Sequence, residues 1–321
     1  MWAFDAEALS SELIRALRGG RSQPALSRRL GYASNVLYTW ESGRRWPTGS
    51  QAFRLIAKTG HDPRAPWSRF AIELGDADPT TREGLVELLT RVRGTTRVAT
   101  VAERCGVSRF AASRWLRGQA EPRLPELLTL IEALTLRLAD FIAALVDPAE
   151  LPTLRDHWRA IGIRRQVAFT HPWSQAILRA LETTEYRRSR GGRAHAPWLA
   201  DHLGIAPETV TEALSALSDA GLITHDAGRW VTEPIAIDTS IATAEARRDL
   251  KAHWASVGRE RLLAGADGLF SWSVFAVSQA DYERVRELHV AYMHSLRQIV
   301  DESSPSEVVA MVNVQLFRLD R

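Results

Sequence analysis

The sequence is poor in cysteine and has no long apolar run, and each absence excludes a class of protein. Cys105 is the only cysteine among 321 residues, so the chain can form neither an internal disulfide nor a thiolate cage for a metal. No apolar run approaches the ~20 residues that a bilayer-spanning helix needs. The first twenty residues carry Asp5, Glu7 and Glu12 and lack the apolar core of a signal peptide. We therefore expect a cytoplasmic protein without a membrane anchor.

Motifs for catalysis and metal binding are missing as well. His289 and His294 lie five residues apart on an expected helix, which places them on different faces, and His195 and His202 lack a third partner nearby. The sequence has no glycine-rich phosphate loop between a strand and a helix, and no nucleophile elbow. We expect no enzymatic activity, no bound metal and no cofactor.

The charge is divided unevenly along the chain. Residues 1–125 hold 20 Lys and Arg against 12 Asp and Glu, a net charge of +8, whereas the remainder holds 21 against 26, a net charge of −5. The two parts sum to the overall charge of +3. A basic front half suggests a region that binds a polyanion, joined to a region with another task.

A self-similarity with a period of 75 residues is the most informative feature of the sequence. Identical residues recur at this spacing, among them Arg29 and Arg104, Gly31 and Gly106, Trp40 and Trp115, Gly43 and Gly118, and Pro47 and Pro122. Each copy predicts a short helix, a turn at glycine and a second helix that ends at tryptophan. A glycine-containing loop and a proline follow, and then a further helix, at 50–59 in the first copy and 124–136 in the second.

The first two helices of each copy have the pattern of a helix-turn-helix. Glycine at the turn tolerates the backbone angles with which two helices cross over about three residues. The second copy, residues 106–118, closely resembles the Cro/phage-repressor type of helix-turn-helix, the XRE-like class. The first copy, residues 31–47, keeps the frame but carries unusual outward residues. We expect Leu37 and Ala112 to face inward and both tryptophans to belong to the core.

This resemblance implies that the outward residues of the second helices enter the major groove of DNA. These candidate contacts are Ser34, Asn35, Tyr38 and Thr39 in the first copy and Arg109, Phe110, Ser113 and Arg114 in the second. Arginine can bond guanine bidentately, and asparagine can do the same with adenine. Arg44 and Arg45, just past the first motif, are expected to contact phosphates. For Phe110 two interpretations stay open: an exposed ring that meets a thymine methyl, or a buried one.

A third pair of helices, within residues 198–219, is followed by a short hairpin expected at 222–224 and 229–232. Two helices with a two-stranded wing resemble the winged-helix fold of many bacterial regulators. The second helix of this pair carries Glu208, Glu212 and Asp219 and no basic residue, and phosphates would repel these carboxylates. We therefore favour a structural or dimerising role for it. The arginine-rich loop 187–193 is either a phosphate contact or a solvated loop.

The last eighty residues alternate between helical and strand patterns. Residues 240–264 and 281–302 have helical periodicity, whereas 269–278 and 308–319 are rich in apolar and β-branched residues and predict strands. The resulting β–α–β order indicates a small mixed domain.

Residues 213–319 resemble a domain of uncharacterised bacterial proteins that are predicted transcriptional regulators. The resemblance rests on the wing, on the motif at 250–254, on the strand pattern before a long helix, and on the terminal motif at 313–319. Arg318 replaces a proline that usually follows the terminal phenylalanine of that motif. The family supplies no ligand or chemistry to transfer.

Together these features predict a mainly α chain with two tandem helix-turn-helix domains, a winged-helix domain and a small C-terminal α/β domain. The expected boundaries are 1–75, 76–147, 148–236 and 237–321. The expected function is sequence-specific regulation of transcription through paired helix-turn-helix units on double-stranded DNA. We expect a homodimer assembled by the C-terminal domain, because its strands carry more apolar surface than one helix can cover. The alternative is that the winged helix of the same chain covers that surface.

Two other classes of function remain as alternatives. In one, the acidic back half is the working surface of a protein-interaction or antitoxin-like factor, and DNA binding is secondary. In the other, a hydrolase-like site lies in the C-terminal region, which would require a deep polar pocket with coupled titratable groups. An effector or protein partner, if one exists, is not identified by the sequence.

Overall fold

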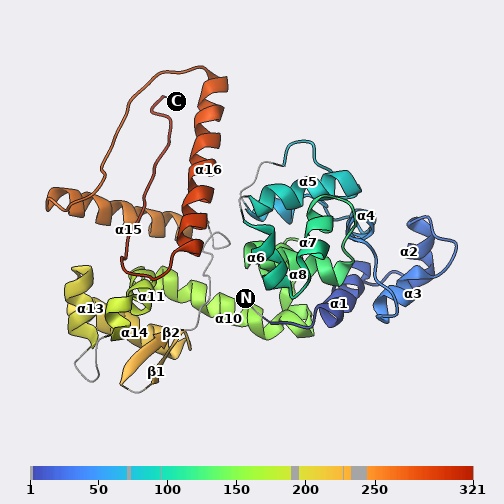
Figure 1. The fold of residues 1–321 in the computed structure, drawn as a ribbon, viewed down its shortest axis with the longest axis horizontal. Helices are drawn as coiled ribbons and strands as arrows, with labels where there is room; N and C mark the ends of the chain where they lie inside the picture. Colours follow the sequence, from blue (N-terminus) through green and yellow to red (C-terminus); the bar gives the residue numbers. More distant parts are fainter. Residues whose placement is uncertain are drawn as a thin grey trace. The chain divides into compact units, whose positions relative to one another are not determined.

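A computed structural model describes residues 3–70, 74–94, 96–188, 195–226, 228–232 and 244–320. This part of the chain is mainly helical, with sixteen α-helices and one two-stranded sheet (Figure 1). The chain divides into two compact units, Met1–Arg159 and Ala160–Arg321. In the described residues, no helix is both long enough and apolar enough to cross a membrane.

Unit 1 contains the repeat as two sets of four helices. The first set is α1 (Ala6–Arg18), α2 (Gln23–Arg29), α3 (Val36–Glu41) and α4 (Gly49–Lys58). The second set is α5 (Arg82–Arg93), α6 (Val98–Cys105), α7 (Arg109–Leu116) and α8 (Leu124–Thr135). We call these sets repeat 1 and repeat 2. The order of helices and glycine turns predicted from the 75-residue period is confirmed, as are the inward positions of Leu37 and Ala112, both 0% exposed.

A glycine stands between the second and third helices of each repeat for a conformational reason. Gly31 follows α2 with φ of 88°, and Gly106 follows α6 with φ of 65°. Residues with a Cβ rarely adopt this left-handed region, so glycine lets the chain turn sharply from one helix into the next.

The two repeats meet about a local twofold axis. Thr48 and Arg123, which are 75 residues apart, form an isolated antiparallel bridge. The Gly49 amide donates to the Pro122 carbonyl at 2.9 Å, and the Leu124 amide donates to the Pro47 carbonyl at 2.9 Å. Donor and acceptor of the second bond are the 75-residue counterparts of those of the first. Such reciprocity is the mark of an isologous interface, here formed inside a single chain.

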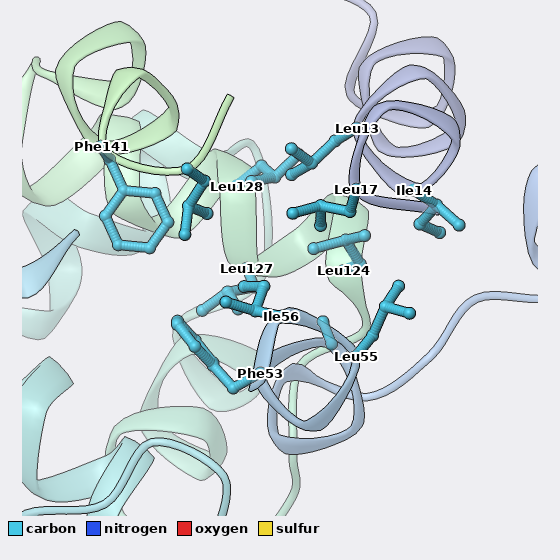
Figure 2. Close-up of a pocket in the computed structure, with 12 residues that line it drawn as sticks. Leu13, Ile14, Leu17, Phe53, Leu55, Ile56, Leu124, Leu127, Leu128 and Phe141 are labelled. Carbon is cyan, nitrogen blue, oxygen red and sulfur yellow. The ribbon is translucent and has the colours of Figure 1, made fainter. Parts of the chain in front are cut away.

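Apolar side chains from both repeats fill the space around this axis. Figure 2 shows leucines of α1, aromatic and aliphatic residues of α4, and leucines of α8 pointing toward one another. Phe141 of α9 (Leu138–Ala143) closes the cluster. The remaining space is about 10 Å³, room for at most one water molecule. The cluster is therefore a packed core and not a ligand pocket.

Three shorter elements complete unit 1. They are the 3₁₀ helices Trp67–Phe70 and Pro148–Glu150 and the first part of α10 (Pro152–Thr170). The start of α10 is fixed to α1, because Glu12 accepts hydrogen bonds from the amide and the hydroxyl of Thr153, at 3.0 and 2.9 Å.

Unit 2 begins with four helices and a hairpin around one apolar cluster. The elements are α11 (Ser174–Glu182), α12 (Thr184–Arg188), α13 (His195–Leu203), α14 (Pro207–Asp219), β1 (Ile223–Asp226) and β2 (Arg229–Thr232). The antiparallel register pairs Ile223 with Thr232 and Asp226 with Arg229. The hairpin is thus confirmed, although its first strand runs two residues further than the sequence pattern predicted. Val210, Leu214 and Leu217, the predicted apolar stripe of α14, are buried in the cluster.

The C-terminal part of unit 2 departs from the prediction. Its two helices, α15 (Ala244–Leu263) and α16 (Gln279–Glu302), lie where helical periodicity placed them. The strands expected at 269–278 and 308–319 are absent from the described chain, so the predicted β–α–β arrangement is wrong in this respect. A strand exists only while a neighbouring strand takes up its backbone hydrogen bonds, and neither segment has such a neighbour. We call 269–278 arm 1 and 308–319 arm 2.

Candidate nucleic-acid interface

In repeat 1 the candidate DNA contacts surround the beginning of α3. Asn35 is the N-cap of this helix, and its Oδ1 accepts from the Tyr38 amide at 3.3 Å and from the Ser27 hydroxyl at 3.2 Å. This acceptor is therefore committed to the fold, which limits bidentate recognition of adenine by Asn35. Ser34 and Tyr38 are exposed, whereas Thr39 is half-buried and its hydroxyl donates to the Val36 carbonyl at 2.7 Å.

In repeat 2 the corresponding residues lie at the start of α7. Ser108 caps this helix by accepting from the Ala111 amide at 3.2 Å, which leaves Arg109 and Phe110 in its first turn. Both of these side chains are exposed, and Phe110 is 71% exposed. Of the two interpretations of Phe110, the structure thus shows the exposed ring. Ser113 is half-buried and Arg114 is exposed.

An arginine lies over an exposed aromatic ring in both repeats. The Arg44 guanidinium lies 5.2 Å from the centre of the Tyr38 ring, and that of Arg114 lies 5.7 Å from the centre of the Phe110 ring. A cation over a ring face is held by the ring quadrupole, with an energy of about 0.5–1 kcal/mol at exposed sites. These contacts orient each guanidinium without consuming its hydrogen-bond donors.

The basic residues of this surface are free of carboxylate partners. Within the part of the chain that the structure describes, no ion pair involves Arg44, Arg45, Arg109 or Arg114. Sequence reasoning missed the exposed Arg117, at the C-cap of α7, although the glycine loop beside it is the repeat 2 counterpart of the loop that holds Arg44 and Arg45. Unpaired exposed arginines supply the positive field that phosphate binding requires.

A buried carboxylate, which the sequence analysis also missed, fixes α3 to its neighbours. Glu41 is 6% exposed, and its carboxylate accepts from Arg18 Nε at 2.5 Å and from Gln23 Nε2 at 2.7 Å. Its backbone carbonyl accepts from Arg15 Nη2 at 2.8 Å. The carboxylate of Glu41 raises the pKa of Arg18. These bonds attach α1 and α2 to the end of α3 and so set the angle at which α3 is presented.

The outward face of α14 in unit 2 has the opposite charge. Glu208, Glu212 and Asp219 are all exposed there. Arg187 and Arg188 are exposed at the end of α12, and the rest of the arginine-rich loop lies outside the described residues. The described residues contain no group of three or more His, Cys, Asp or Glu side chains that could hold a metal ion.

Comparison with known proteins covers the back half of the chain. Residues 163–319 match the family model described as Domain of unknown function (DUF4423), a region that begins within α10 and ends with arm 2. The match thus includes the helices and hairpin of unit 2, but it names no class of regulator. No curated protein and no solved structure matches the chain.

Proposed function

We propose that this protein is a sequence-specific DNA-binding regulator of transcription that reads the major groove with α3 and α7. In this proposal α2–α3 and α6–α7 are tandem helix-turn-helix units, and α13 and α14 with the hairpin of β1 and β2 form a winged-helix unit with a structural role. The observation that carries it is the local twofold axis, because it relates two helix pairs that each present an exposed N-terminal turn beside unpaired arginines.

The twofold relation has a consequence for the DNA site. Helix-turn-helix dimers bind half-sites about 34–36 Å apart, and the site repeats the symmetry of the protein. In Figure 1 the α2–α3 pair lies apart from the α6–α7 pair within unit 1. A single chain would then bind two inverted half-sites. Since the exposed residues of α3 and α7 differ, the two half-sites should differ in sequence.

Selection from a pool of random duplexes tests this proposal on the full chain at moderate salt. We expect enrichment of a site with two unlike half-sites in inverted orientation, about one helical turn apart. Failure to enrich any sequence would refute sequence-specific binding. Enrichment of a single half-site would refute the paired arrangement.

Substitutions on the two helices identify the residues that read DNA. Arg109→Ala and Arg114→Ala should each weaken binding to the selected site, since a lost bidentate base contact costs roughly 1–3 kcal/mol of discrimination. The matched control is Arg259→Ala, an exposed arginine of α15, which should leave affinity unchanged. Glu208→Ala should leave affinity unchanged or slightly raise it, because it removes a negative charge from α14. If Glu208→Ala abolished binding while Arg109→Ala had no effect, α14 would be the reading helix.

A second candidate function is suggested by the acidic face of α14. In that case the protein is an interaction or antitoxin-like factor, and its DNA affinity is weak and non-specific. Isothermal titration with separate duplexes of different sequence distinguishes the two candidates. Non-specific binding would show the same affinity for every sequence and a steep loss of affinity with rising salt concentration.

A further inference from the structure

The two C-terminal arms expose an unusual amount of apolar surface. Among the described residues, twenty-four large apolar side chains are exposed; nineteen of them lie between Leu262 and Leu319, and twelve of these belong to the arms. The exposed fractions of the four aromatic residues in the arms are Phe270 44%, Trp272 89%, Phe275 50% and Phe317 64%. At about 200 Å² per aromatic side chain, these four alone expose roughly 500 Å². Soluble monomers rarely leave apolar patches larger than a few hundred Å² uncovered, so the arms require a partner.

The backbone of the arms lacks a partner as well. In the described chain, no backbone–backbone hydrogen bond joins residues 267–277 or 307–319 to any other segment. In Figure 1 each arm is a long trace drawn without an arrow, one before α16 and one after it. A row of free amide and carbonyl groups beside apolar side chains is a template for another extended chain. The missing partner therefore supplies both main-chain hydrogen bonds and apolar side chains.

Each arm leaves unit 2 from a fixed point. Before arm 1, the guanidinium of Arg261 donates to the carbonyls of Leu203 and Gly204, which ties the end of α15 to the end of α13. Before arm 2, the Ser306 carbonyl accepts from the Thr184 amide at 2.7 Å and from the Thr184 hydroxyl at 2.9 Å. Within arm 2, Val309 packs on the apolar cluster of α11, α13 and α14. The winged-helix region of the same chain therefore binds the residues at the start of each arm but leaves most of the apolar side chains of the arms uncovered.

The charge of this region favours a protein partner over nucleic acid or an anionic membrane. Residues 264–320 contain four arginines and eight acidic residues, a net charge of −4, and residues 268–280 and 308–317 contain no charge. Two arginines of α16 pair within the helix, Arg284 with Asp281 at 2.9 Å and Arg286 with Glu283 at 2.6 Å. This region therefore offers no basic surface to which phosphates or anionic lipids would bind.

We propose that two copies of this chain exchange their C-terminal arms, so that residues 269–278 and 308–319 of each copy pair with those of the other in one intermolecular β-sheet. A second copy offers two extended segments of matching chemistry, in which Arg318 near the end of arm 2 is the one charged residue, and twofold exchange occupies every arm in a closed assembly. Leu288, Tyr292 and Ile299 are exposed on α16 at spacings of four and seven residues, which places them on one face that can cover such a sheet. A stable interface needs about 800 Å² per partner, and the aromatic residues of the arms supply more than half of this area. This proposal does not depend on DNA binding.

Light scattering on the full chain at micromolar concentration tests the assembly. We expect a particle of twice 35.8 kDa. Val274→Asp, at a residue of arm 1 that is 70% exposed, should convert it to the monomer, because a carboxylate would be buried in the shared sheet. The matched control is Val231→Asp, at a residue of β2 that is 44% exposed, which should remain dimeric. A monomeric wild-type chain, or a Val274→Asp variant as dimeric as the control, would overturn the proposal.

Hydrogen exchange on the wild-type chain at two concentrations provides a test that needs no substitution. If the arms are exchanged, amides in 269–277 and 308–319 are protected at high concentration and lose protection on dilution to the monomer. Protection that does not change on dilution would mean that the arms pair within one chain. If the arm amides exchange hydrogen at the unprotected rate in the purified protein, the partner of the arms is a different molecule. Either result contradicts the exchange of arms between copies.

Discussion

Repeat 1 and repeat 2 share one backbone frame but use different chemistry inside it. In repeat 1, Glu41 joins α1, α2 and α3 through hydrogen bonds with Arg18 and Gln23. The 75-residue counterpart of Glu41 is Leu116, which is 7% exposed and packs in the core. Arg93, the counterpart of Arg18, remains, and its buried Nε has no hydrogen-bond partner within the described chain.

This difference shows which residues define the frame and which can be exchanged. The turn glycines, the tryptophans and the prolines recur at the same spacing, whereas a buried ion pair in one repeat is a leucine contact in the other. Replacing a buried ion pair by well-packed apolar residues is often neutral for stability, while removing one member of the pair is costly. In repeat 2 the acidic member of the pair has become a leucine while the arginine remains half-buried, so the frame does not depend on the ion pair.

The largest effect is expected where repeat 2 has a glycine and repeat 1 has a buried leucine. Gly84 is the counterpart of Leu9, and a Cβ added at Gly84 would lie 2.1 Å from the Asp78 carbonyl oxygen and 2.5 Å from its amide nitrogen. The backbone of Asp78 cannot rotate away as a side chain would. Gly84→Ala should therefore lower the free energy of unfolding by about 3 kcal/mol, the upper end of overpacking effects. Urea titration followed by circular dichroism measures it.

The matched control for this substitution is Gly20→Ala. A Cβ at Gly20 meets no atom within 4 Å, and its φ is not in the left-handed region, so stability should change by less than about 0.5 kcal/mol. Equal effects of the two substitutions would show that the chain around Asp78 does not pack against α5 as described.

The second largest effect is expected for Glu41→Ala, which removes the buried hydrogen-bond network of repeat 1. It removes the carboxylate but leaves the donors of Arg18 and Gln23, so we expect a loss of about 2 kcal/mol, less than for a fully buried pair because Arg18 remains partly hydrated. Glu41→Leu copies repeat 2 and should cost less than the alanine variant. The control is Glu103→Ala, at an exposed glutamate of α6, which should be neutral within about 0.5 kcal/mol. A loss below 0.5 kcal/mol for Glu41→Ala would show that the network is not stabilising.

Comparison of the repeats also shows what the sequence could and could not predict. Glycine, tryptophan and apolar spacing sufficed for the helix order and for the buried positions of Leu37 and Ala112, because these depend on local periodicity. The partnership of Glu41 and Arg18 could not be predicted, since it depends on how helices 23 residues apart cross. The capping role of Asn35 was predictable in principle, because asparagine directly before a helix favours the N-cap.

The prediction that the two arms are strands was wrong for a different reason. Their composition satisfied every local criterion for a strand, but pairing is a non-local property, and the described chain contains no second strand beside either arm. In contrast, β1 and β2 are separated by only two residues, so each strand has its partner nearby in the chain. There the strand prediction was correct.

The smallest effect on stability is expected at Cys105, whose counterpart in repeat 1 is Leu30. Burial raises the pKa of this thiol from 9.0 to about 11, so the folded state favours the protonated form. This preference stabilises the fold below pH 9 and is lost as the pH rises from 9 toward 11. At pH 8 the thiolate fraction should be about a hundredfold lower than for a thiol of ordinary pKa, and the thiolate is the reactive form.

A chromogenic disulfide reagent should therefore react with the native chain at pH 8 about a hundred times more slowly than with the chain in urea. Cys105→Leu, which copies repeat 1, should change the free energy of unfolding by less than about 1.5 kcal/mol, since a small apolar contact is exchanged for a larger one in a half-buried place. Comparable rates in the native and unfolded chains would mean that α6 opens readily. In that case repeat 2, without the ion pair of Glu41, would be the less rigid of the two repeats.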